Sequence, residues 1–515
     1  MRLSTLALAA SLLAAPLLAQ PVAITSSGAV IGKVEGASEA FLGVPYATAA
    51  RWLDPQPVAP WQGKRDATSY GPACYQGLAG AWGPYTQDFV AGAPISEDCL
   101  TLNVWKPAGA AKGLPVFVFI HGGAFQGGAG SLPIYNGSKL APRGAVVVTI
   151  NYRVGVFGFL AHPELSAESA RKTSGNFGLL DQIAALRWIK ANAARFGGNP
   201  ANVTVSGESA GAASVNDLVS SPLAKGLFAK AISFSGPSMA IDMPSLAEGH
   251  ANGAALAEKL GAKSVSELRA VPADKLVEAT AITPVEGGGP PPLLFRPHRD
   301  RAILPHDPVD AKAPIASPVP LMGGFNSAEM IDLSVRTPAD FEKAVRRRYG
   351  AFADRLLALY PHASDAEATA SNQLISRDRY LSGLVLWTQV RARASGQPVY
   401  AYLYDHPYPP VRGQIAWGAF HTSGIPYVFG QLGHGDRQFT AADAAVSRQW
   451  QERLLAFLRT GNPSTRTSRW LRAGSSGDRV MVIGDKPGMR AAVSSPERFN
   501  AFRDYAAAGG SLGLM

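Results

Sequence analysis

The chain alternates between short, continuously apolar runs and longer stretches in which apolar residues recur every three or four positions. The runs at 115–120 (PVFVFI) and 145–150 (AVVVTI) predict central strands, because strands of a parallel sheet are buried on both faces. Apolar residues recur at helical spacing over 177–196, and Gly197 and Gly198 end that helix. This alternation indicates an α/β fold with a large, mostly parallel central sheet flanked by helices.

A second strand and helix are joined by a sharp turn. The segment 202–206 (NVTVS) predicts a strand, Gly207 opens the turn, and small and apolar residues over 210–219 predict a helix. Further strands are expected at 228–234, 318–322 and 399–404.

The middle of the chain has a different pattern. Two amphipathic helices are predicted at 246–260 and 265–280, separated near Gly261. A loop with glycines at 287–289 and prolines at 290–292 follows, and neither a helix nor a central strand accommodates such a stretch. We interpret about 240–305 as a helical, cap-like insertion over the sheet, and 284–292 as a segment that could form a mobile lid. No clear linker interrupts 20–515, so we predict a single catalytic domain.

The first 19 residues have the pattern of a signal peptide. Arg2 provides the positive start, 3–18 is almost wholly apolar, and Ala19 offers a small residue before Gln20. A membrane anchor is the alternative, but the apolar stretch is short and no second hydrophobic span follows. We therefore predict a secreted or periplasmic protein without an integral membrane segment after cleavage.

The composition is that of a globular protein, with 47% hydrophobic and 17% charged residues and a net charge of +10. The basic residues are scattered and no aromatic-interleaved basic stripe appears, so no nucleic-acid partner is expected. One local group would attract anionic esters if it bordered the site; the favoured interpretation is that it faces solvent or pairs with Asp300 and Asp307. Its members are Arg296, His298, Arg299 and Arg301.

The chain has two cysteines, Cys74 and Cys99. In an oxidising compartment they have only each other to pair with, so one disulfide is expected, with two free buried thiols as the alternative.

The segment 207–211 (GESAG) matches the pattern G-x-S-x-G. Its position between a predicted strand and a helix of small residues is the setting of a nucleophile elbow, which makes Ser209 the candidate nucleophile. The loop that follows the 115–120 strand begins His121-Gly122-Gly123-Ala124. Gly122 and Gly123 are predicted to supply backbone N–H donors to an oxyanion from one side, and Ala210 from the other.

These motifs resemble the type-B carboxylesterase/lipase family, the cholinesterase-like α/β-hydrolases. The resemblance spans about 22–503 and is carried by several further segments. They are FLGVPYA (41–47), SEDCLTLNVW (96–105), NYRVGVFGFL (151–160), GNFGLLDQ (175–182), FGGNPANVTVSGESAGA (196–212), SGP (235–237), GFNSAE (324–329) and GAFHTSGIPYVFG (418–430). The resemblance implies one α/β-hydrolase domain, hydrolysis of small-molecule esters, and no cofactor or metal.

The resemblance also implies roles for single residues. Glu329 matches the family's catalytic acid, His421 its histidine, and Glu208 its supporting acid beside the nucleophile; the family's disulfide near SEDC is matched by Cys74 and Cys99. The sequence departs from the family around the acid, where 328–330 reads Ala-Glu-Met, and in having Gly424 where an acidic residue is common. Asp332 is therefore kept as an alternative acid.

Together these features predict a serine carboxylesterase that works through an acyl-enzyme on Ser209 with a Ser-His-Glu triad. The alternatives are a lipase, an amide or lactone hydrolase of the same fold, or a binding homologue without activity. The physiological ester and the oligomeric state are not predicted.

Overall fold

The computed structural model describes residues 20–236, 243–282, 293–308, 310, 313–329 and 334–513. The predicted signal peptide at 1–19, the glycine- and proline-rich loop at 284–292 and the alternative acid Asp332 lie outside the described residues.

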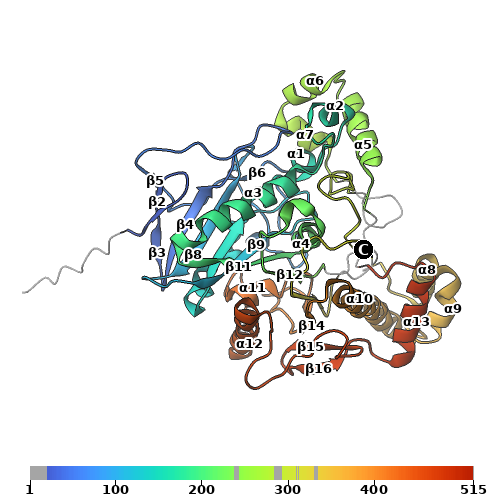
Figure 1. Cartoon of the computed structure of the whole chain (residues 1–515). Helices are drawn as coiled ribbons and strands as arrows, with labels where there is room; N and C mark the ends of the chain where they lie inside the picture. Colours follow the sequence, from blue (N-terminus) through green and yellow to red (C-terminus); the bar gives the residue numbers. More distant parts are fainter. Residues whose placement is uncertain are drawn as a thin grey trace, which may run out of the picture.

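An eleven-stranded sheet forms the centre of the molecule (Figure 1). Its strands lie in the order β16-β15-β14-β13-β12-β11-β9-β10-β8-β4-β3, and the pairs from β15 to β10 are all parallel, whereas the outer pairs are antiparallel. The strand bounds are β3 Lys33–Glu35, β4 Ser38–Pro45, β8 Thr101–Pro107, β9 Leu114–Ile120, β10 Val146–Ile150, β11 Gly198–Glu208, β12 Lys230–Phe234, β13 Leu321–Asn326, β14 Val399–Asp405, β15 Arg479–Gly484 and β16 Gly488–Ala491. The expected large sheet with a parallel centre is confirmed.

The central strands are apolar throughout because both of their faces are covered. In β9, alternate side chains enter two different cores: Val116, Val118 and Ile120 pack in one, and Phe117 and Phe119 in the other. The first core includes side chains of α3 (Phe177–Asn192) and α4 (Ala210–Ser220). The second includes side chains of α11 (Ile425–Phe429) and α12 (Ala441–Thr460).

Two groups of helices lie away from the central layers in Figure 1. In one, α5 (Leu246–Lys259), α6 (Val265–Ala270) and α7 (Ala273–Ala279) gather near α1 (Gly155–Phe159) and α2 (Pro163–Glu168). In the other, α8 (Pro338–Tyr349), α9 (Ala353–Leu357) and α13 (Pro496–Ala507) gather at one end of α10 (Asp365–Ser395). Within the part of the chain that the structure describes, no helix is long and apolar enough to cross a membrane.

Three predicted elements differ from the structure. The helix predicted at 265–280 is two helices, α6 and α7, because Pro272 has no N–H to donate and its ring displaces the preceding turn. The strand predicted at 318–322 begins only at Leu321, after Pro318 and Pro320. The strand predicted at 202–206 is longer in both directions, since β11 pairs with β9 and β12 up to Gly207 and Glu208.

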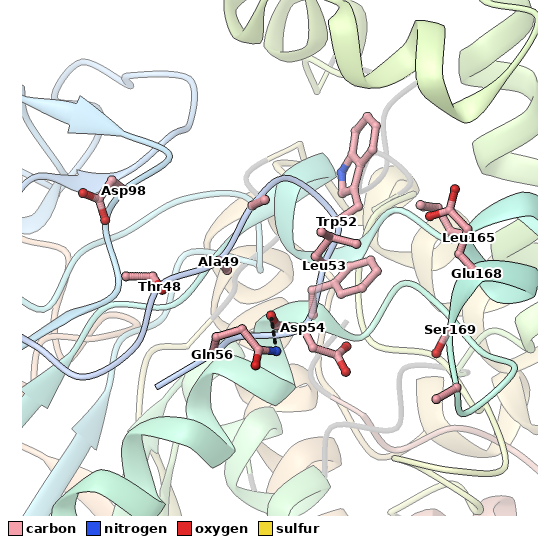
Figure 2. Close-up of a pocket in the computed structure, with 13 residues that line it drawn as sticks. Thr48, Ala49, Trp52, Leu53, Asp54, Gln56, Asp98, Leu165, Glu168 and Ser169 are labelled. Carbon is pink, nitrogen blue, oxygen red and sulfur yellow. Dashed lines mark hydrogen bonds between the residues drawn. The ribbon is translucent and has the colours of Figure 1, made fainter. Parts of the chain in front are cut away.

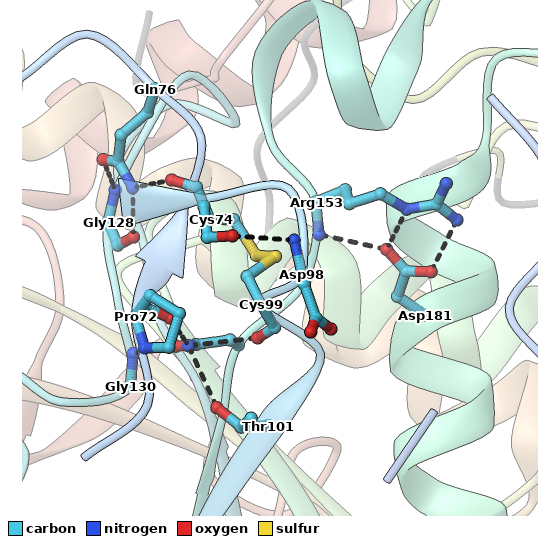
Figure 3. Close-up of a disulfide and its surroundings, with 12 residues drawn as sticks. Pro72, Cys74, Gln76, Asp98, Cys99, Thr101, Gly128, Gly130, Arg153 and Asp181 are labelled. Carbon is cyan, nitrogen blue, oxygen red and sulfur yellow. Dashed lines mark hydrogen bonds and ion pairs between the residues drawn. A yellow bond between two sulfur atoms is a disulfide. The ribbon is translucent and has the colours of Figure 1, made fainter. Parts of the chain in front are cut away.

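A disulfide joins Cys74 and Cys99 next to a short two-stranded sheet made of β6 (Ala73–Cys74) and β7 (Ile95–Ser96) (Figure 3). The Gln76 side chain donates to the carbonyl of Gly128 at 2.9 Å and accepts from the N–H of Gly128 at 2.7 Å. The segment enclosed by the disulfide is thereby fixed against the glycine-rich loop that follows β9.

We expect the double substitution Cys74→Ala/Cys99→Ala to lower the free energy of unfolding by about 3–4 kcal/mol, because the disulfide closes a loop of 25 residues. Urea denaturation monitored by circular dichroism measures this difference. Reduced wild-type protein is the matched control and should unfold at the same urea concentration as the variant. Equal midpoints for oxidised wild type and the variant would contradict the expectation.

Candidate active site

Ser209 lies in the tight turn between β11 and α4, with a backbone φ of +58°. Glycines on both sides make this turn sterically feasible. A Cβ on Gly207 would lie 2.2 Å from the carbonyl oxygen of Gly211, and a Cβ on Gly211 would lie 2.1 Å from that of Ile120 in β9. Both distances are far shorter than atoms tolerate, so only glycine fits at either position. The strand–turn–helix context expected for the G-x-S-x-G segment is therefore present.

Ser209 opens onto a cavity of about 620 Å³. The disulfide-enclosed segment contributes Tyr75 to Leu78, Trp82, Tyr85 and Phe89 to its wall, and the loop after β9 contributes Gly122 to Gly128. Other parts of the wall come from 154–157 and, beyond α7, from Thr280 to Ile282 and Leu293. The wall is mostly aromatic and aliphatic, and its described residues include no lysine or arginine.

The loop after β9 presents backbone amides next to Ser209. A Cβ on Gly122 would lie 2.8 Å from the Glu208 carbonyl oxygen and 2.9 Å from the Ser209 Cβ, so only a glycine lets the loop pass this close to the turn. The N–H groups of Gly122, Gly123 and Ala124 donate to no acceptor among the described residues, and Ala210, the first residue of α4, has no intrahelical acceptor either. From the sequence, Ala124 was not predicted as a donor. Its backbone has a φ of +55°, and the residue lines the same cavity.

His421 and Glu329 are in contact although they lie 92 positions apart. The imidazole Nδ1 is 2.5 Å from Oε2 of Glu329. Two features bring them together: Ala328 and Phe420 form a parallel β-bridge, and Asn326 Nδ2 donates to the Phe420 carbonyl at 2.6 Å. The loop with Glu329 and the loop with His421 are thus fastened to each other.

The Glu329 carboxylate is fully buried and is held on its other oxygen as well. Its Oε1 accepts from the Ser235 hydroxyl and from the backbone N–H of Asn326, both at 2.7 Å. Ser235 and Asn326 belong to segments that carried the family resemblance, but no function was predicted for either residue. Their positions at the ends of β12 and β13 place them beside the Glu329 carboxylate.

Glu208 lies on the opposite side of the imidazole. Its Oε1 is 3.3 Å from His421 Nε2 and accepts a hydrogen bond of 2.8 Å from the Thr422 hydroxyl. No hydrogen bond joins the Ser209 hydroxyl to His421 in the described structure, although both side chains line the same cavity. The imidazole is therefore placed between two carboxylates, at the cavity that Ser209 also lines.

These two carboxylates determine the electrostatics of the site. Burial by itself lowers the pKa of His421, but the negative charges of Glu208 and Glu329 outweigh it and raise the pKa to about 9. Burial raises the pKa of Glu208, while His421 and the Thr422 hydroxyl act in the opposite direction. His121 differs, since burial lowers its pKa to about 4, and its ring stacks on Tyr152 at 4.4 Å.

A second hollow of about 820 Å³ lies elsewhere on the molecule (Figure 2). Its wall includes the carboxylates of Asp54, Asp98 and Glu168, and it contains no histidine. Asp54 and Glu168 are paired with Arg171 and Arg269. Among the residues described, no cluster of His, Cys, Asp or Glu is arranged to hold a metal ion. Ser209, His421 and the amides without acceptors occur together in the smaller cavity.

The basic group that would attract anionic esters if it bordered the site is not among the described residues that line the cavity of Ser209. His298 is buried, with its Nε2 2.8 Å from the Ser174 carbonyl oxygen. Asp300 does not serve as a surface partner for the arginines; it is buried and accepts backbone hydrogen bonds from Ile303 and Leu304. Among the residues described, this side of the molecule gives the cavity no lysine or arginine.

Comparison with known proteins agrees with this arrangement. The model of the carboxylesterase family matches residues 19–499. The chain belongs to the carboxylesterase family. It is 36% identical over 485 residues to a fumonisin B1 esterase from Sphingopyxis macrogoltabida, covering 90% of this chain and 86% of that protein. It is 37% identical over 474 residues to a para-nitrobenzyl esterase from Bacillus subtilis (strain 168), covering 87% and 92%.

Solved structures confirm the α/β-hydrolase fold of this carboxylesterase. A PNB esterase superimposes with a TM-score of 0.75 and 32% identity, covering 93% of this chain and 99% of that one. The protein is thus a carboxylic ester hydrolase, as the sequence predicted.

We expect His421 to titrate near pH 9, well above the ordinary imidazole value of 6.5. NMR of the imidazole protons measures this, with His421→Gln to assign the resonance. In Glu208→Gln the pKa should fall, because one of the two negative charges that favour the imidazolium is gone. Titration near 6.5 in the wild type, or no decrease in Glu208→Gln, would contradict the expectation.

Proposed function

We propose that the carboxylesterase hydrolyses esters through an acyl-enzyme on Ser209, with His421 as general base and acid and Glu329 as its partner. The observation that supports the proposal is that Ser209, His421 and amides without acceptors line one cavity, while the buried Glu329 contacts His421 Nδ1 from behind. His421 takes the hydroxyl proton while Ser209 Oγ bonds to the ester carbonyl carbon. The imidazolium then gives that proton to the departing alcohol.

Deacylation repeats the sequence with water as the nucleophile. His421 removes a proton from the water, the new C–O bond forms, and the proton returns to Ser209 as the acid leaves. In both halves the carbonyl oxygen becomes negative. The amides of Gly122, Gly123 and Ala210, with Ala124 as an added candidate, are the donors for that oxygen. Glu329 holds Nδ1 protonated, so that Nε2 is the nitrogen that exchanges the proton.

The residues that line the cavity also indicate which class of ester the enzyme prefers. Its wall is aromatic and aliphatic, and its charged groups are Glu208 and His421 without a lysine or arginine among the described residues. A carboxylate on the substrate would enter an apolar enclosure beside the Glu208 carboxylate and would lose its hydration without a lysine or arginine to pair with. We therefore infer a preference for uncharged esters with apolar acyl or alcohol groups.

The decisive variant is Ser209→Ala, which should abolish hydrolysis of a short-chain p-nitrophenyl ester while the protein stays folded. Ser220→Ala, at the other end of α4, is the matched control and should keep full activity. In the wild type, a fluorophosphonate should attach to the peptide containing residue 209, as detected by mass spectrometry. Activity retained in Ser209→Ala would refute the proposal.

We also propose that residues 1–19 direct export and that 20–515 is one catalytic domain. When the full chain is expressed in a Gram-negative host, N-terminal sequencing of the periplasmic or secreted enzyme should begin near Gln20. A chain lacking residues 2–19 should stay in the cytoplasm. Finding uncleaved full-length chain in the cytoplasmic fraction would contradict the export signal.

A further inference from the structure

Thr422, the residue after the proposed base, has an unusual backbone. Its φ is +75°, in the left-handed region, where a β-branched residue is rarely found because its side chain crowds the backbone. Thr422 is also buried, with 8% of its surface exposed. Glycine would adopt this conformation without strain. A residue held in a costly conformation inside an active site indicates that its side chain has a function there.

The Thr422 hydroxyl donates to Oε1 of Glu208 at 2.8 Å, and the same oxygen lies 3.3 Å from His421 Nε2. The other oxygen, Oε2, is confined by Gly122, since a Cβ on that glycine would lie 2.7 Å from it. The carboxylate is therefore fixed between the hydroxyl and the glycine backbone. At 3.3 Å its distance to the imidazole is longer than that of a close charge-assisted hydrogen bond, which is about 2.7–2.9 Å.

We propose that Thr422 is a positioning residue whose hydroxyl holds the Glu208 carboxylate short of close contact with His421, so that the imidazole stays available to Ser209. This inference rests on the proposed function, because it assumes that His421 exchanges a proton with Ser209. A carboxylate that receives a hydrogen bond from Thr422 is a weaker base and attracts the imidazolium less. Without the hydroxyl, Oε1 can close on Nε2 and keep the imidazole protonated and turned away from the nucleophile.

Two negatively charged groups face the His421 imidazole, the carboxylates of Glu208 and Glu329. Glu329 faces His421 from the loop after β13, and Tyr85 donates from its hydroxyl to the His421 carbonyl at 3.1 Å. The surrounding phenols are buried and their pKa values are raised, in part by these carboxylates, so they stay neutral. They are Tyr85, Tyr135, Tyr152 and Tyr402.

The test is the pH dependence of kcat/KM for an uncharged p-nitrophenyl ester in Thr422→Val, which keeps the shape of the side chain and removes the hydroxyl. The acid limb of the profile should move to higher pH by roughly half a unit to one unit. Activity at neutral pH should then fall roughly 3- to 10-fold, because only the neutral imidazole accepts the serine proton. The plateau above the limb should stay close to that of the wild type.

Three further variants separate positioning from folding. Thr422→Ser keeps the hydroxyl and should show the wild-type limb. Thr422→Gly removes both hydroxyl and strain, so its limb should move as in Thr422→Val while its Tm is equal to or higher than that of the wild type. In a Glu208→Gln background, Thr422→Val should leave the titration of His421 unchanged, because the carboxylate it restrains is absent.

An acid limb that is the same in Thr422→Val as in the wild type would overturn the inference. So would equal shifts in the Ser and Val variants. A loss of activity per titrated active site by the same factor at every pH would also overturn it, because the pKa of the imidazole would then be unchanged. These outcomes leave the proposed function intact as long as Ser209→Ala is inactive. Activity in Ser209→Ala would instead remove the proposed function, and the inference with it.

Discussion

The active site depends on the close approach of three backbones: the end of β9, the end of β11 and the first turn of α4. Gly211 lies against the carbonyl of Ile120, Gly207 against that of Gly211, and Gly122 against Ser209. A Cβ on Gly207 would push β11 away from α4, and a Cβ on Gly122 or Gly211 would push the end of β9 and its loop away from the turn. The contact thereby sets the distance between the Ser209 hydroxyl and the amides of the loop, and it also confines the Glu208 carboxylate. The distance between the Ser209 hydroxyl and these amides, on which the proposed chemistry relies, is therefore set by the close packing of glycines and not by a hydrogen bond.

The parts of the fold that the sequence predicted well are those that local pattern determines. The central strands 115–120 and 145–150 are apolar on both faces. The turn at Ser209 is indicated within a few residues by a preceding strand, two glycines and a following helix of small residues. His421 and Glu329 are different, because the sheet brings them together from 92 positions apart. No local pattern measures such a distance, so these two residues were identified through the family resemblance alone.

The features that were missed follow from backbone detail that sequence patterns do not reveal. The break at Pro272 could have been predicted, since its ring is incompatible with a continuing helix. The pairing of Thr422 with Glu208 could not, because it needs a left-handed threonine after the histidine and nothing in the residue type signals that conformation. The net charge of +10 was likewise uninformative about the site, whose wall has two opposed charges and no described lysine or arginine.

An imidazole between two carboxylates meets opposing demands. The imidazolium that forms in each proposed proton transfer is stabilised by both negative charges, which lowers the cost of the transition state. The same charges favour the imidazolium before any substrate reacts, and a protonated base accepts no proton. Glu329 lies on the Nδ1 side, where it contacts the neutral and the protonated imidazole without blocking the proposed proton transfer. Glu208 lies on the Nε2 side, the nitrogen that would receive the proton of Ser209 in that proposal. A carboxylate at that position assists catalysis only if it is close enough to act through its charge and is kept from binding the nitrogen itself. The proposed mechanism therefore calls for a restraint on Glu208, and the hydrogen bond from the Thr422 hydroxyl is the contact that we propose supplies it.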